Sequence, residues 1–287
     1  MNRFAGEDAG SLHEARRRGE LVMFYQPKVD MASGMAIGVE ALVRWHHPIL
    51  GLLCPAMFEV AIKSRNPVTF GLIHWAIHTA VKQIADWKKI GLSIPVSVNV
   101  MASELINDNF CEWLDDVFKQ HPDVNRTMLE LEIVESSNLS NLEQVISVIT
   151  RCRAAGVKFA LDDFGTGYSS LSYVRNVPAD YVKIDRMFVK DLTTNHQDRG
   201  LVQLVISLAH LFDRKVIAEG VESIEQGSEL IKLGCKYAQG YAIARPMAAA
   251  DLPSWVHQYK GYPEWSEGCL AHEANYTPVA DKRPSLC

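Results

Sequence analysis

The chain has 287 residues, of which 48% are hydrophobic and 22% are charged, as is usual for a globular protein. A formal net charge of −5 excludes the basic face of proteins that bind duplex nucleic acid, so no such partner is expected. The six cysteines form no C-x-x-C pair, so we expect no zinc site. No run of about 18 apolar residues occurs, so we expect no membrane span. The N-terminus lacks the apolar core of a signal peptide, and we expect a cytoplasmic location.

The N-terminal part of the chain predicts a short helix and then a hairpin. Residues 11–19 have the composition of a charged helix that ends at a glycine. Residues 21–29 and 36–45 are expected strands. Because only a short turn separates them, they must be antiparallel neighbours.

The second strand of this hairpin carries polar residues on one face. Strand alternation places Glu40, Leu42 and Arg44 on the same side. An acid and an arginine on one strand face are natural for a functional site. An exposed ion pair on a solvated face would give the same pattern.

The rest of the chain alternates between strands and helices, which favours a parallel α/β protein. With the hairpin, about eight strands are expected, so the prediction is a TIM-like (β/α)₈ barrel. An open doubly wound sheet is the alternative, but it would normally carry a G-x-G-x-x-G motif after an early strand, and none is present. The further strands are expected at residues 94–98, 128–134, 158–161, 181–185, 216–219 and 236–238, and the helices at 55–64, 71–90, up to about 120, 140–156, 198–212 and 223–234.

The alternation of strands and helices also sets the expected domain boundaries. Residues 1–11 are an N-terminal extension and residues 12–258 form the barrel. From residue 259 the sequence becomes polar and rich in turn residues, so 259–287 are expected to be a flexible tail.

Polar residues stand at the ends of the predicted strands. Asp162 and Asp163, for example, directly follow an apolar strand and precede a glycine-containing turn, where a helix cap and a loop acid are the simpler interpretation. On a barrel, however, the strand ends converge on one mouth. The residues concerned are Glu40, Asn99, Glu132, Asp162, Asp163, Lys183, Glu219 and Gln239.

This set of side chains predicts a metal centre. Five carboxylates and an amide oxygen facing one another would repel unless cations lay among them, and hard oxygen ligands select Mg²⁺ or Mn²⁺. Two ions that share a carboxylate such as Asp162 would suit phosphate ester hydrolysis. Lys183 could orient or deprotonate a water, and Arg44 could hold a phosphate oxygen. The residues alone therefore indicate a metal-dependent phosphodiesterase or phosphatase; a barrel lyase or isomerase with one Mg²⁺ and Lys183 as base is the alternative.

Seven sequence blocks, in order, resemble the EAL-domain family of cyclic di-GMP phosphodiesterases. The first contains the Glu40-Ala41-Leu42 signature within Y-Q-P-K-V-D and G-V-E-A-L-V-R-W-H-H-P. The others are S-V-N-V, L-E-I-V-E, D-D-F-G-T-G-Y-S-S, V-K-I-D, A-E-G-V-E, and Q-G-Y with A-R-P, and the resemblance covers about residues 12–256. Two departures are Val134, where threonine is common, and residues 61–70, which lack the usual acidic segment.

The resemblance implies a TIM-like barrel with an antiparallel first strand and hydrolysis of cyclic di-GMP to linear pGpG. A catalytically silent cyclic di-GMP receptor is the alternative, although such domains usually lose several ligands. It also implies a homodimer and leaves room for a signalling module before the domain. By motif, the metal ligands would be Glu40, Asn99, Glu132, Asp162, Asp163 and Glu219. Of these, Glu40, Asp162 and Glu219 would be catalytic together with Lys183, the water-activating residue. The nucleotide would be bound by Gln26, Leu42, Arg44, Glu222 and Gln239, and Glu135 would anchor the loop that begins at Asp163.

Overall fold

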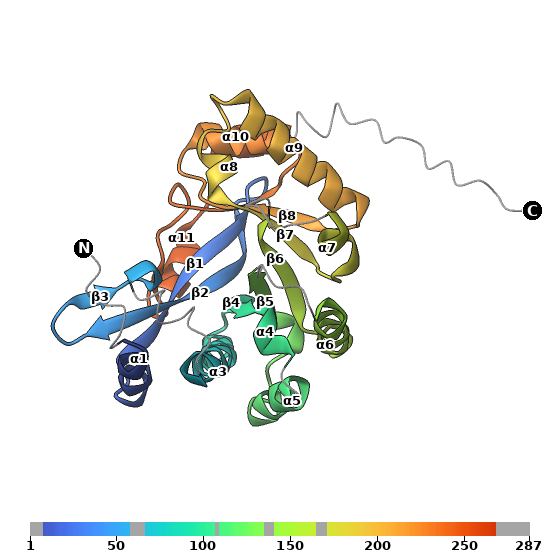
Figure 1. Cartoon of the computed structure of the whole chain (residues 1–287). Helices are drawn as coiled ribbons and strands as arrows, with labels where there is room; N and C mark the ends of the chain where they lie inside the picture. Colours follow the sequence, from blue (N-terminus) through green and yellow to red (C-terminus); the bar gives the residue numbers. More distant parts are fainter. Residues whose placement is uncertain (1–7, 58–66, 107–108, 135–140, 165–170, 268–287) are drawn as a thin grey trace, which may run out of the picture.

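The computed structural model describes residues 8–57, 67–106, 109–134, 141–164 and 171–267. Eight of the described strands close a barrel in the order β1-β2-β4-β5-β6-β7-β8-β9, which confirms the predicted TIM-like fold (Figure 1). Two short strands, β3 and β10, extend the sheet beside β2 and β1. The strands are β1 Leu21–Asp30, β2 Met35–His47, β3 Gly51–Leu53, β4 Val96–Met101, β5 Leu129–Val134, β6 Lys158–Phe164, β7 Tyr181–Ile184, β8 Lys215–Ala218, β9 Tyr237–Gln239 and β10 Met247–Ala248.

The first strand runs against the rest of the barrel, as the short hairpin turn requires. β1 is antiparallel to both of its barrel neighbours, β2 and β9, whereas β2 and the strands from β4 to β9 pair in parallel. In the β1–β2 register Gln26 lies opposite Glu40. This pairing places two predicted site residues side by side.

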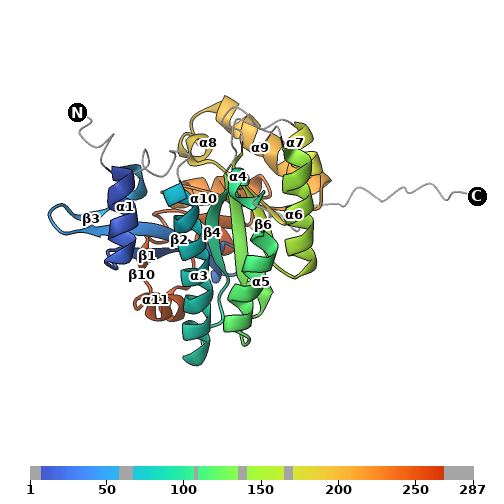
Figure 2. The ribbon, with the colours of Figure 1, turned by 60° about the horizontal axis from the view of Figure 1, so that its bottom comes forward.

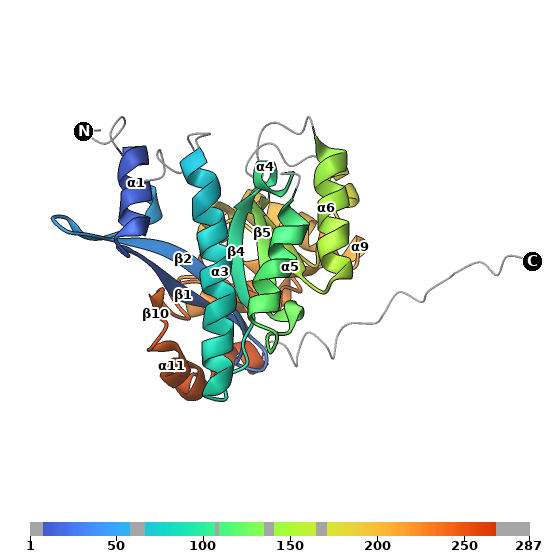
Figure 3. The same ribbon diagram turned by 90° about the horizontal axis from the view of Figure 1, so that it is seen from below.

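Helices cover the outside of the barrel. Figures 2 and 3 show α3, α5 and α6 next to one another on one flank, while the β2–β3 end projects beside α1. The apolar repeat of α3 faces the sheet, where Ile77, Ala80 and Val81 are completely buried. The helices are α1 Asp8–Arg17, α3 Pro67–Lys89, α4 Ala102–Leu105, α5 Phe110–Gln120, α6 Leu142–Ala154, α7 Leu171–Asn176, α8 Arg186–Lys190, α9 His196–Leu211, α10 Ile224–Lys232 and α11 Leu252–Gln258, with 3-10 helices η1 Pro55–Met57 and η2 Arg126–Met128.

Several expectations fall on residues outside the described ranges. The helix expected at 55–64 begins as η1, and its remainder, with most of the departing segment 61–70, is not described. Glu135 and residues 165–170 of the loop after Asp163 also lie outside. None of the described helices is long and apolar enough to cross a membrane.

The prediction of a flexible tail is wrong for its first part. The ring of Trp265 is fully buried, and its Nε1 donates to the carbonyl of Ile224 at 2.9 Å. The hydroxyl of Tyr262 donates to the carbonyl of Ala242. Gly227 on α10 makes this packing possible, because a Cβ at that position would lie 2.3 Å from the Trp265 ring. Residues 259–267 therefore pack on the barrel, and 268–287 are outside the described residues.

Replacing Trp265 with alanine is expected to lower the free energy of unfolding by about 3–5 kcal/mol, since it empties a fully buried aromatic site. Chemical denaturation of the variant and the wild type measures the difference. Gly227→Ala should also destabilise the protein, because its new methyl group displaces the same ring. The exposed Leu204, changed to alanine, is the control. A Trp265→Ala variant as stable as this control would contradict the packing described here.

Candidate active site

The carboxyl ends of the barrel strands bring together the polar residues that the sequence singled out. Asn99, Glu132, Asp162 and Lys183 lie on four consecutive parallel strands, β4 to β7, and Glu219 directly follows β8. Parallel strands present their C-terminal ends at the same edge, which explains the convergence. Glu40 and Gln239 join from β2 and β9.

Lys183 lies at the centre of this cluster. Its Nζ is 2.5 Å from a Glu219 oxygen, 2.6 Å from Glu132 and 3.0 Å from Asp162, and a Glu40 oxygen lies 3.8 Å away. The Lys183 side chain is only 1% exposed. A single buried ammonium group therefore forms ion pairs with four carboxylates.

A chain of amides and one carboxylate lines the adjacent wall. Gln239 donates to Gln26 Oε1 at 3.0 Å and to Glu40 Oε2 at 2.6 Å, and Asn99 donates to Glu40 Oε1 at 2.6 Å. Gln26 in turn donates to the carbonyl of Ala244. The Oδ1 of Asn99 and the Oε1 of Gln239 are buried and have no hydrogen-bond partner among the described residues. Both oxygens remain available as acceptors or ligands.

Asp162, Asp163 and Glu219 form a second group, with one oxygen of each within 4.8 Å of the others. Asp163 has a positive φ of 52°, which a non-glycine residue adopts at an energetic cost. Burial and the charge of Asp162 raise the pKa of Asp163 to about 7. Three carboxylates this close together are a suitable ligand set for a divalent cation.

The pKa values of three of the four carboxyl groups around Lys183 indicate a shortage of positive charge, whereas Lys183 and Lys28 outweigh burial at Glu132 and hold its pKa below the usual range. Burial raises the pKa of Glu40 and Asp162, and raises that of Glu219 well above its usual range. Burial alone would lower the pKa of Lys183, but Asp162 and Glu132 outweigh it and raise that pKa well above its usual value. Lys183 thus stays protonated, but its single positive charge does not balance the charge of the carboxylates around it. A carboxylate that is buried without a balancing charge is costly, which is why these pKa values are raised.

These observations fit a pair of divalent cations. The cluster and the layer of side chains below it hold six carboxyl groups and two lysines, a formal charge of −4 when all are ionised. Two divalent cations would balance this charge, and the unpartnered Asn99 oxygen would be a further hard ligand. The carboxyl groups are Glu40, Glu130, Glu132, Asp162, Asp163 and Glu219, and the lysines are Lys28 and Lys183.

The remaining predicted residues lie towards the rim of the mouth. Arg44 is buried on β2 beyond Leu42; its Nη1 donates to the carbonyl of Val43, and its guanidinium lies over the Phe24 ring. Glu222 is exposed, in the segment between β8 and α10.

Sequence reasoning missed the layer of polar residues below the mouth. Lys28 is 3% exposed, and its Nζ donates to Ser97, Glu130 and Glu132. A signal was present, because Lys28 and Gln26 share one face of β1 and Glu130 and Glu132 share one face of β5. In a barrel that face is the interior.

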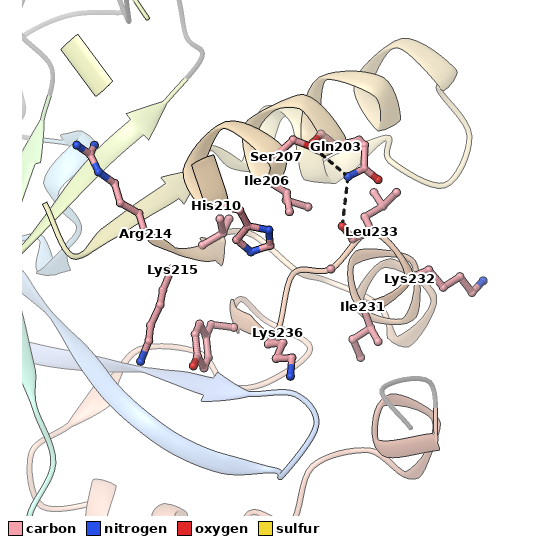
Figure 4. Close-up of a pocket in the computed structure, with 13 residues that line it drawn as sticks. Gln203, Ile206, Ser207, His210, Arg214, Lys215, Ile231, Lys232, Leu233 and Lys236 are labelled. Carbon is pink, nitrogen blue, oxygen red and sulfur yellow. Dashed lines mark hydrogen bonds between the residues drawn. The ribbon is translucent and has the colours of Figure 1, made fainter. Parts of the chain in front are cut away.

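A separate cavity of about 670 Å³ lies between α9 and α10, beside the N-terminal ends of β8 and β9 (Figure 4). Gln203 spans α9 and the end of α10, donating to Ser207 Oγ at 3.5 Å and to the Leu233 carbonyl at 3.4 Å. None of the clustered carboxylates lines this cavity. It is therefore distinct from the mouth at the opposite strand ends.

Comparison with known proteins gives one family. Residues 9–246 match the EAL domain. The cyclic di-GMP phosphodiesterase PA2567 of Pseudomonas aeruginosa is 36% identical over 236 residues, which are 82% of this chain and 40% of that protein. The cyclic di-GMP phosphodiesterase PdeR of Escherichia coli is 34% identical, over 87% of this chain and 37% of its own length. The chain thus spans less than half of these curated relatives.

Solved structures agree with this relationship. The EAL enzyme Bd1971, in its cAMP- and cyclic di-GMP-bound form, aligns with a TM-score of 0.81 and 29% identity over 88% of this chain and 70% of that one. The PaMucR phosphodiesterase in complex with cyclic di-GMP aligns with a TM-score of 0.79 and 34% identity, over 85% of this chain and 98% of that one. The shared region in both cases includes the barrel.

Proposed function

The chain belongs to the EAL domain family, and from this membership we propose that it hydrolyses cyclic di-GMP to linear pGpG with the help of two Mg²⁺ or Mn²⁺ ions. The observation that carries the proposal is the cluster of four carboxylates around one buried lysine, together with the unpartnered oxygen of Asn99. The names of the relatives support the choice of substrate.

The proposed ligands divide between the two groups of side chains. Glu40, Asn99 and Glu132 would hold cations on one side of the mouth, and Asp163 and Glu219 on the other. Asp162 and Glu219 both lie in the two groups, and Asp162, which directly precedes Asp163, is proposed as the shared ligand. Two cations in such a site lower the pKa of a water molecule and neutralise charge on a phosphate.

The other residues are proposed to bind and orient the substrate. Lys183 carries a positive charge at the base of the mouth, where it would orient the attacking water and stabilise negative charge developing on the phosphate. Arg44 would hold a phosphate oxygen, since its planar guanidinium matches that geometry. The Gln239 Oε1 is an acceptor for an N–H group of a base, and Gln26 positions this amide through their mutual hydrogen bond. Leu42 and Glu222 would contact the nucleotide from the rim.

Three further parts of the proposal concern the whole protein. The catalytic unit would comprise about residues 12–267, because residues 259–267 pack on α10. A signalling module before this unit is supported by the greater length of the relatives. A homodimer, and anchoring of the loop after Asp163 by Glu135, rest on the family resemblance.

Incubation of the purified protein with cyclic di-GMP and Mn²⁺ tests the activity, with the nucleotides separated by chromatography. We expect linear pGpG to accumulate. Turnover should stop when EDTA removes the cation, because the carboxylates would then repel one another, and it should return when excess Mn²⁺ is added. Binding of cyclic di-GMP in a calorimetric titration with no product under any of these conditions would instead identify a silent receptor.

A further inference from the structure

Lys28 lies in a layer of side chains directly below the proposed metal ligands. It comes from β1, the antiparallel strand, and meets Ser97 on β4 and Glu130 on β5. Each of these two residues stands two positions before a proposed ligand, Asn99 or Glu132, so it occupies the same interior face one layer deeper. Lys28 therefore connects the interior of the barrel to its mouth.

The ammonium group of Lys28 is fully satisfied. An ammonium has three donors, and here three acceptors surround it: Ser97 Oγ at 3.0 Å, Glu130 Oε1 at 2.6 Å and Glu132 Oε1 at 3.0 Å. All three partners are buried. Rotating the ammonium away would leave at least one buried charge unpaired, which fixes this arrangement.

Glu132 is held from two sides as a result. Its Oε1 accepts from Lys28, while its Oε2 accepts from Lys183 at 2.6 Å. The carboxylate is 0% exposed, so these contacts set its orientation. Lys183 faces the mouth, where it shares its charge with three further carboxylates; Lys28 lies in the layer below and pairs with Glu130 and Glu132.

We propose that Lys28 is a positioning residue for the metal centre: it fixes Glu132 through one oxygen so that the other oxygen faces the cation, and Ser97 and Glu130 hold Lys28 in place. This inference rests on the proposed function, because it takes Glu132 to be a cation ligand. It adds a residue outside the ligand set on which the affinity of that set depends. Partners that orient a ligand in this way commonly change metal affinity by about 10- to 100-fold when removed.

The test compares two variants that differ only at Lys28. Lys28→Met alone would leave Glu130 buried without its cationic partner and Glu132 with Lys183 alone, and this could unfold the barrel. Glu130→Gln and the double variant Lys28→Met/Glu130→Gln avoid this, because the double variant removes one charge of each sign. Mn²⁺ affinity is measured by calorimetry without substrate, thermal unfolding reports the fold, and steady-state kinetics separates kcat from KM.

We expect the double variant to bind Mn²⁺ at least about 10-fold more weakly than Glu130→Gln. At a fixed, subsaturating Mn²⁺ concentration kcat should fall with it, and KM for cyclic di-GMP should change little, because Lys28 lies below the substrate mouth. Ser97→Ala, which removes one support of the ammonium, should weaken Mn²⁺ binding by about 2- to 10-fold. Lys158→Met is the control: Lys158 begins β6 at the far end of the barrel, pairs with Asp180, and should not affect Mn²⁺ binding.

A folded double variant with the Mn²⁺ affinity of Glu130→Gln would overturn the inference. If the double variant does not fold, Ser97→Ala decides, and wild-type affinity in that variant counts against the inference. A wild-type protein that binds Mn²⁺ but does not hydrolyse cyclic di-GMP refutes the proposed function alone, since the affinity comparison still stands. A wild-type protein that binds no Mn²⁺ refutes both.

Discussion

Replacing Glu40 with alanine is expected to reduce turnover of cyclic di-GMP by more than about 10²-fold, a loss typical of removing one preorganised electrostatic group from an active site. Glu40 is buried, and its two oxygens accept from Asn99 and Gln239, each at 2.6 Å. The substitution therefore removes a proposed cation ligand and releases the two amides beside it. Nucleotide chromatography with excess Mn²⁺ measures the rate, and calorimetry measures the metal affinity, which should also fall.

Two further variants separate these contributions. Glu40→Gln keeps the shape of the side chain but removes its charge, so it should lose turnover, while its single carbonyl oxygen can still accept from one of the two amides, Asn99 or Gln239. Glu112→Ala is the control, because that exposed carboxylate pairs with Arg151 on the surface of α5 and α6, where an ion pair contributes about 0–1 kcal/mol. Wild-type turnover in Glu40→Ala would refute the assignment of Glu40 to the metal centre.

The mouth of the barrel could be predicted from sequence because of where its residues stand. Asn99, Asp162 and Glu219 each end an apolar run, and in a parallel α/β protein such positions share one edge. The convergence of these residues was predicted from their positions at strand ends, and the oxygen-only ligand set from their residue types, both of which can be read from the sequence.

Other features depend on contacts that the sequence does not reveal. Lys28 and Glu130 alternate with apolar neighbours, a pattern equally typical of a strand with one solvated face. Only closure of the barrel turns that face inwards and pairs the two residues at 2.6 Å. Likewise, Trp265 stands among polar residues, and its packing depends on Gly227, which lies on a helix well before it in the chain. The residues of the candidate site could thus be predicted from the sequence, whereas the buried interactions that support the site and the fold could not.

The central position of Lys183 gives the second large effect. Changing Lys183 to methionine is expected to reduce kcat by about 10²–10³-fold, the range associated with losing one preorganised group that stabilises charge in the transition state. Metal binding should respond differently. In this structure the ammonium occupies the middle of four carboxylates, where it would compete with a metal cation for the same oxygens. Its removal should leave Mn²⁺ affinity unchanged or increased.

Stability measurements distinguish this behaviour from simple damage to the fold. In EDTA, Lys183→Met should be less stable than the wild type by about 3–5 kcal/mol, because Asp162 and Glu219 lose their buried cationic partner and Glu132 keeps only Lys28. Added Mn²⁺ binds only the folded protein and should raise the unfolding temperature more in the variant than in the wild type, since no ammonium has to be displaced. Lys158→Met should show the wild-type shift. A smaller Mn²⁺-induced shift in Lys183→Met would mean that the lysine helps to build the cation site and does not compete with the metal for it.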